Sequence, residues 1–127
     1  MKNILIAFFV LATLGATAQS PVQFKEVKHS FGKIKQGIPT TYVFNFKNTT
    51  NKPLVIESAV AGCGCTTPEF PKAPIAKGKM GTIKVTYNAA NPGAFTKDVT
   101  VKFLNTPQPT VLTIDGEVEP KKEAAKP

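Results

Sequence analysis

The sequence predicts an all-β protein built as a sandwich of antiparallel strands. Apolar residues recur at every second position along most of the chain, which is the side-chain period of a strand, and almost never at helical spacing. Clusters of Asn, Thr, Pro and Gly separate these segments. About seven short strands in about 100 residues, with turns at intervals of roughly ten, are typical of an immunoglobulin-like β-sandwich.

The strongest alternation lies in residues 38–47. There the aromatic side chains of Tyr42, Phe44 and Phe46 share one face, as in a half-buried antiparallel strand. Residues 95–103 repeat the pattern, and the remaining segments are shorter versions of it. In chain order, the expected strands are 22–28, 31–35, 38–47, 54–60, 82–87, 95–103 and 111–118.

Turn chemistry separates these strands. Segments 48–53, 88–93 and 105–109 combine asparagines, which cap turns, with prolines, which cannot continue a ladder. Antibody-type domains join their sheets by a distant disulfide across a buried Trp, whereas this chain has no Trp and its cysteines are Cys63 and Cys65. Hydrophobic packing must therefore hold the sheets together, mainly through Tyr42, Phe44, Phe46, Ile56, Ile83, Val85, Tyr87, Phe95, Val99, Val101, Leu112 and Ile114.

The two ends of the chain differ in composition from its middle. Lys2, an apolar stretch and the A-x-A site at 16–18 together predict a cleaved signal peptide at residues 1–18. As a helix the apolar stretch covers about 16 Å, roughly half of a bilayer core, so it is a poor membrane span. We therefore expect a soluble periplasmic or secreted protein with no integral membrane segment after cleavage. It would have one β-sandwich domain at 19–119 and a disordered Lys-rich tail at 120–127.

The charge of the chain excludes one class of partner. The formal net charge is +8, and all 16 cationic residues are lysines. Arginine is the side chain that makes bidentate contacts to guanine and phosphate, so its absence argues against nucleic acid as a partner. The lysines are scattered over the strand-like segments and the tail, as on a solubilising surface.

The segment that carries chemistry is Gly62-Cys63-Gly64-Cys65-Thr66-Thr67-Pro68. It follows the 54–60 strand, so we expect it in a loop at one end of the sandwich, where binding sites usually lie. In an extended chain the Cα atoms of Cys63 and Cys65 would be about 7 Å apart, whereas a disulfide needs about 4.4–6.8 Å. A bridge therefore requires a bend, which the two glycines permit.

Four hypotheses for the cysteine pair remain open. Cys63 and Cys65 form a strained disulfide that exchanges with other thiols, or a passive pair that only fixes the loop. Alternatively they bind a soft metal, Cu(I) or Zn(II), for which His29, the only histidine, would have to supply a third ligand. In the fourth hypothesis, the bridge shapes a partner-binding loop that includes Gly62, Gly64, Thr66, Thr67 and Pro68.

The sequence offers little to an enzyme. A nucleophilic cysteine needs a nearby base, and His29 is the only histidine. Asp98 and Asp115 lie in strand-like segments and are expected to face solvent. No glycine-rich loop precedes a predicted helix that could hold phosphate. We expect no catalytic residue and no cofactor.

Motifs spread over nearly the whole chain beyond the signal peptide also lead to a family resemblance. They are Phe24, Glu26, His29, Phe31-Gly32, Gly37, G-C-x-C-T-x-P at 62–68, Pro74-Ile75, Gly78, G-x-I-x-V-x-Y at 81–87, G-x-F-x-K-x-V-x-V at 93–101, Asn105 and L-x-I-x-G-x-V at 112–118.

Together these motifs resemble the bacterial domain-of-unknown-function family 1573 (DUF1573), which is similar to Hydin-type and PapD-like immunoglobulin-fold modules. The resemblance implies a seven-stranded sandwich in an exported Gram-negative protein, with no established activity. The chain departs from the family pattern at Lys77-Gly78, where a Pro-Gly turn would be expected.

These observations predict a non-catalytic binding or structural module of the bacterial cell envelope. Its partner would be another envelope protein, bound through loops or through an exposed edge strand. The alternative function is thiol–disulfide exchange or soft-metal binding by Cys63 and Cys65.

Overall fold

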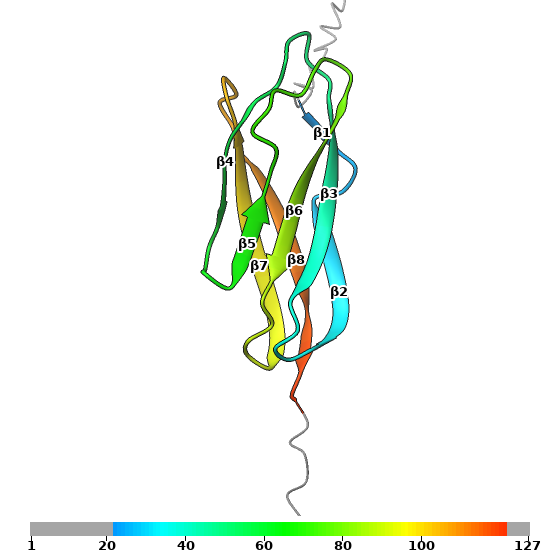
Figure 1. The fold of residues 1–127 in the computed structure, drawn as a ribbon, viewed down its shortest axis with the longest axis vertical. Helices are drawn as coiled ribbons and strands as arrows, with labels where there is room; N and C mark the ends of the chain where they lie inside the picture. Colours follow the sequence, from blue (N-terminus) through cyan, green and yellow to red (C-terminus); the bar gives the residue numbers. More distant parts are fainter. Residues whose placement is uncertain (1–21, 122–127) are drawn as a thin grey trace, which may run out of the picture.

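Alternating side chains produce eight strands in residues 22–121, the part of the chain that the computed structural model describes (Figure 1). Seven of them correspond to the expected strands, and the eighth lies in the segment expected to be a loop. In chain order they are β1 (Val22–Phe24), β2 (Lys28–Lys35), β3 (Thr40–Asn48), β4 (Ile56–Ala61), β5 (Thr66–Glu69), β6 (Met80–Tyr87), β7 (Gly93–Phe103) and β8 (Thr110–Glu119).

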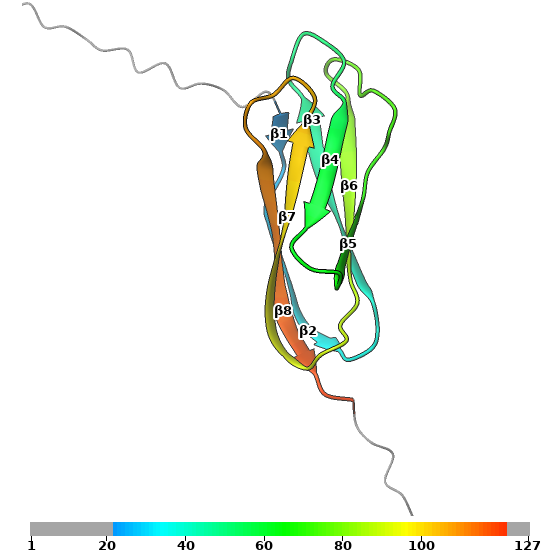
Figure 2. The ribbon, with the colours of Figure 1, turned by 90° about the vertical axis from the view of Figure 1, so that its left-hand side faces the viewer.

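The strands form two four-stranded sheets that pack face to face (Figures 1 and 2). The first sheet has the order β1-β3-β6-β5 and is antiparallel throughout. The second has the order β2-β8-β7-β4, and in it β2 runs parallel to β8. The predicted all-β sandwich is confirmed. Purely antiparallel pairing is wrong for β2, because the chain changes sheets after β1 and enters the second sheet in the direction of β8.

The core lies between the two sheets, where every second residue of the central strands points inward. Its largest fully buried side chains are Phe44, Phe46 and Phe103. All the expected core residues are buried except Tyr42, which is half-buried. The structure adds Val22, Leu54, Ile75, Ala89, Phe103 and Val118 to the core.

Strand β5 corrects the sequence analysis. Thr66, Thr67 and Pro68 pair with β6 rather than lying in a loop. Thr66 is opposite Tyr87 and is buried, whereas Thr67 is exposed. A four-residue strand with two threonines and a proline shows no hydrophobic alternation, so the sequence carries no signal for it.

Some predictions concern residues outside the described part of the chain. The signal peptide at 1–18, the start of the domain at residue 19 and the tail beyond Lys121 all lie there. Within residues 22–121, no helix is long and apolar enough to cross a membrane.

Candidate functional site

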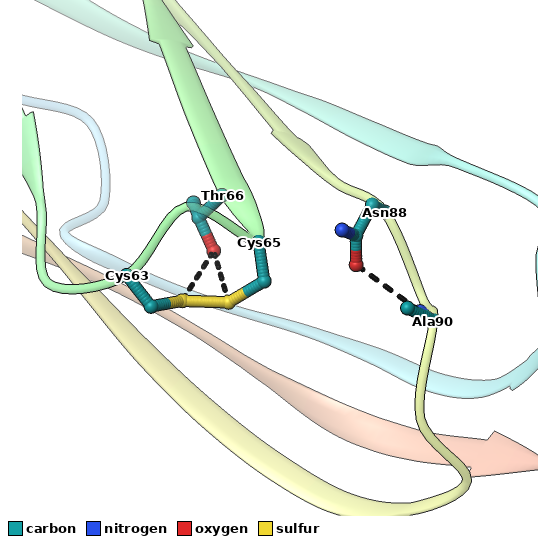
Figure 3. Close-up of a disulfide and its surroundings, with 5 residues drawn as sticks. All are labelled: Cys63, Cys65, Thr66, Asn88 and Ala90. Carbon is teal, nitrogen blue, oxygen red and sulfur yellow. Dashed lines mark hydrogen bonds between the residues drawn. A yellow bond between two sulfur atoms is a disulfide. The ribbon is translucent and has the colours of Figure 1, made fainter.

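Cys63 and Cys65 form a disulfide in the turn between β4 and β5 (Figure 3). Their Cα atoms are 5.3 Å apart, which lies in the range that a disulfide requires. The chain therefore bends between Cys63 and Cys65, as a bridge between them requires.

The bridge adds little to the cohesion of the sheets because it closes a very short loop. Chain entropy gives a loop of three residues about 1–2 kcal/mol of stabilisation, against about 4.7 kcal/mol for a loop of 100 residues. The disulfide therefore fixes the geometry of one turn, and the hydrophobic core holds the two sheets together.

Main-chain hydrogen bonds attach this turn to both sheets. The Gly62 N–H donates to the Asp98 carbonyl of β7 at 3.3 Å, and the Asn88 N–H, just after β6, donates to the Cys65 carbonyl at 2.9 Å. Asn88 is itself held by its side chain, whose Oδ1 accepts from the Ala90 N–H at 3.1 Å (Figure 3). The cysteine pair is thus anchored at the point where the chain crosses from one sheet to the other.

The turn has a packed side and an open side. Cys65 packs against the hydrophobic core, and the hydroxyl of buried Thr66 lies 3.7 Å from Cys65 Sγ and 4.0 Å from Cys63 Sγ (Figure 3). Gly62 and Gly64 are exposed, and a Cβ added at either would meet no atom within 4 Å. The turn is therefore open to solvent on the side of its glycines.

The position of the turn differs from the expected one at the end of the sandwich. Strand β4 pairs only with residues 99–103 of β7, which continues to Gly93 without β4 beside it. The turn therefore lies on the side of the molecule, partway along its length (Figure 2).

His29 lies in β2 and belongs to a different cluster. Its ring stacks on Tyr42 with centroids 3.5 Å apart, meets Phe31 edge-on, and places Nδ1 3.7 Å from Glu26 Oε1. Within residues 22–121 no group of three His, Cys, Asp or Glu side chains could hold a metal ion. The metal hypothesis based on Cys63, Cys65 and His29 therefore lacks its third ligand.

Lys97 is a site residue that the sequence analysis did not identify. The last β4–β7 pair is Ala61 with Val99, and the Gly62–Asp98 hydrogen bond extends the ladder by one step. Beyond this bond the chain bends away toward β5, and the next residue of β7 is Lys97, which is half-buried and occupies the core-facing phase of that strand. The signal that could have identified it is its position in the sequence, because Lys97 shares one face of the strand with the apolar residues Phe95 and Val99.

Edge strands are a second candidate site, and most of them are protected against pairing. Strand β1 has three residues, and β5 has four residues and includes Pro68. Strand β2 carries three lysines and has a register irregularity between Ser30 and Lys33. Shortness, proline, lysine and bulges all discourage the addition of a further strand.

Strand β4 lacks this protection over most of its length. Its irregularity and its only charged residue, Glu57, lie near its start, and Glu57 Oε2 is 3.5 Å from Lys102 Nζ. Residues 58–61 pair regularly with β7. Val60 points away from the core and is 60% exposed.

The hydrogen-bonding phase of β4 follows from the same ladder. In an antiparallel pair, alternate residues direct their main-chain groups toward the partner. The Gly62 N–H bonds to β7, so the main-chain groups of Val60 and Ser58, two and four residues earlier, also point toward β7. The N–H and C=O groups of Ala59 and Ala61 therefore point to the free edge, where another strand could pair with them.

Comparison with known proteins gives a family. The family model described as "Protein of unknown function (DUF1573)" matches residues 22–118. No curated protein matches the chain.

Several solved structures share the fold. A protein of unknown function from Porphyromonas gingivalis W83 is 12% identical, with a TM-score of 0.66 over 81% of this chain and 51% of its own. PapD-like domain 7 of human CEP192 is 10% identical, with a TM-score of 0.61 over 95% and 100% of the two chains. For the Vibrio cholerae VesB protease the identity is 10% and the TM-score 0.61, over 76% of this chain and 32% of the protease. These likenesses show the fold alone, and this chain spans about half the length of the Porphyromonas protein.

Proposed function

The chain belongs to the DUF1573 family, as its motifs predicted, and from this family and its immunoglobulin-like sandwich we propose that it is an exported, non-catalytic binding module of the bacterial cell envelope. It binds another envelope protein by accepting an extended segment of that protein as an added strand beside β4. The family description assigns no activity, so the proposal rests on the sheet edges.

The observation that carries the proposal is the unprotected edge of β4. The main-chain groups of Ala59 and Ala61 offer hydrogen bonds to an incoming strand, which supplies affinity in β-strand addition. The side chain of Val60, 60% exposed on the outer face, offers an apolar contact to the residue of that strand that lies opposite it on the same face. An extended peptide with an apolar residue at that position fits this edge.

Other features support the non-catalytic and exported parts of the proposal. The only histidine lies against Tyr42 and Glu26, so neither cysteine has the imidazole base that nucleophilic catalysis requires. The likeness to the VesB protease covers 32% of that chain and concerns the fold. The A-x-A site at residues 16–18 supports export.

Photo-cross-linking in living bacteria tests the proposal. A photoreactive residue at Ser58, on the outer face of β4, is expected to give one adduct of defined mass on irradiation. The Val60→Lys variant should abolish this adduct, because a lysine on an edge discourages strand addition. Met80→Lys is the matched control, since Met80 is 59% exposed but lies on β6, in the other sheet.

Two results would contradict the proposal. One is an adduct at Ser58 that survives Val60→Lys. The other is a probe at Thr67, on the edge strand β5, that captures a partner when the probe at Ser58 does not. A Cys63→Ser, Cys65→Ser variant shows in the same assay whether the turn belongs to the binding surface.

A further inference from the structure

We propose that the Cys63–Cys65 disulfide is a thiol–disulfide exchange site that oxidises dithiols, with Cys63 Sγ as the attacked atom and the Thr66 hydroxyl as the donor to the departing sulfur. This inference goes beyond the binding function, because it assigns a reaction to the β4–β5 turn. Its substrate class is a dithiol, small or carried by a protein.

Both cysteines are half-buried, but their surroundings differ. Cys65 packs against the core, whereas Cys63 lies between two exposed glycines, and beyond their chain neighbours no atom lies within 4 Å of a Cβ added at either glycine. An incoming thiolate therefore reaches Cys63 Sγ from the open side of the turn. Cys65 becomes the leaving sulfur.

Thr66 is placed to stabilise that leaving sulfur. Its hydroxyl is 3.7 Å from Cys65 Sγ, and the only hydrogen-bonding contacts of this hydroxyl within residues 22–121 are to the two sulfurs. A threonine hydroxyl can rotate its proton toward a developing negative charge. A buried donor that is already in position needs no reorganisation when the charge appears.

Lys97 supplies a positive charge on the same side of the sheet. It adjoins Asp98, whose carbonyl accepts from the Gly62 N–H, and it is half-buried in the core-facing phase of β7. In the described residues no ion pair involves Lys97, so its charge is not neutralised by a carboxylate. A nearby lysine favours the thiolate form of cysteine.

The exchange balances in two steps. The substrate thiolate forms a bond to Cys63 Sγ while the Cys63–Cys65 bond breaks and Cys65 leaves as a thiolate. The second thiolate of the substrate then attacks its own sulfur in the mixed disulfide and displaces Cys63. The substrate has lost two electrons to the cysteine pair, and the two protons that its thiols released to solvent on ionising are balanced by two that the cysteine thiolates take up.

The rate of reduction of the purified protein by dithiothreitol tests the inference, with alkylation and intact mass as the readout. The folded protein should react at least tenfold faster than the same protein in denaturant, where the Thr66 hydroxyl is no longer held beside the two sulfurs. Thr66→Val should slow the folded reaction about tenfold, because a hydrogen bond to a charged group is lost.

Matched variants separate chemistry from folding. Thr66→Ser keeps the hydroxyl and should restore the rate, and Thr67→Val alters an exposed neighbour and should not change it. Lys97→Gln should slow the reaction at low salt and have less effect at high salt. Lys102→Gln, on the same strand, is the control and should not change the rate at either salt concentration. The inference is overturned if the folded protein reacts no faster than the unfolded one, or if Thr66→Val and Thr67→Val react alike.

Discussion

Asn48 is a fully buried polar side chain at the end of β3. Its Nδ2 donates to the carbonyls of Lys52 and Ile75, both at 2.8 Å, and its Oδ1 accepts from the Thr50 N–H at 2.9 Å and hydroxyl at 2.6 Å. The sequence predicted a turn here from composition alone. The structure shows that one amide side chain organises that turn and also binds the segment before β6.

Replacing Asn48 by Asp tests this role with almost no change in shape. The variant loses both donors to the Lys52 and Ile75 carbonyls, so we expect a free energy of unfolding lower by about 2–4 kcal/mol at neutral pH. Urea denaturation measures the effect. Asn51→Asp, at an exposed position in the same turn, is the control, and equal losses in the two variants would contradict the role of Asn48.

Asp115 links stability to pH. The Ser30 hydroxyl, and then Lys28, whose Nζ is 3.3 Å away, lower the pKa of this carboxyl below its usual value. The folded state therefore keeps the charge to lower pH than the unfolded chain does. The resulting stabilisation is complete above the unfolded pKa of about 4 and is lost as pH falls through the lowered folded value.

The expected result is that Asp115→Asn reduces the fall in melting temperature between pH 5 and pH 2. Glu117→Gln removes a carboxylate from the same strand without the Ser30 contact and serves as the control. An identical acid dependence in the wild type and in Asp115→Asn would show that the contact has no effect on stability.

At the scale of elements, hydrophobic alternation predicted seven of the eight strands, because burial of one face imposes a period of two on the sequence. Strand β5 was missed since its four residues are held by pairing with β6 and by the turn before it. The parallel pairing of β2 with β8 was missed as well, because it joins residues about 85 positions apart, such as Lys28 and Thr113, and leaves no local trace.

The same limit applies to the candidate site. The spacing of Cys63 and Cys65 identified the turn directly. The contacts that give the turn its chemistry depend on the pairing of β5 with β6 and on the Gly62–Asp98 bond to β7, which hold Thr66 beside both sulfurs. Register between strands is set by the whole sheet, so the sequence pattern alone could not predict these contacts.

The β2–β8 pair depends on a close approach at Gly116. A Cβ at this position would lie 2.7 Å from the Gly32 carbonyl oxygen and 3.0 Å from the Phe95 ring. Gly116→Ala should therefore push β2 away from β8 and lower the free energy of unfolding by about 1–3 kcal/mol. Hydrogen exchange should accelerate at β2 amides more than at β3 amides.

Gly62→Ala is the matched control for this element. Its added Cβ would meet no atom within 4 Å, and its φ lies outside the left-handed range. If Gly116→Ala leaves β2 as protected as Gly62→Ala does, the close approach is not a determinant of this pairing.

At the scale of the whole molecule, the two sheets cohere through the core and not through the disulfide. Cys63→Ser with Cys65→Ser should lower the free energy of unfolding by only about 1–2 kcal/mol, because the bridged loop is so short. Phe44→Ala should cost about 3–5 kcal/mol, since Phe44 is completely buried. Urea denaturation compares the two, and a greater loss from the double serine variant would contradict this account.

The parallel arrangement of β2 and β8 has a mechanical consequence. Lys28, where β2 begins, and Glu119, where β8 ends, lie at opposite ends of the shared ladder, and the described chain ends beyond β8 at one end of the long axis (Figure 1). A tension applied between these two points pulls β2 and β8 in opposite directions along their shared ladder. The hydrogen bonds between the two strands are then loaded together rather than broken one after another.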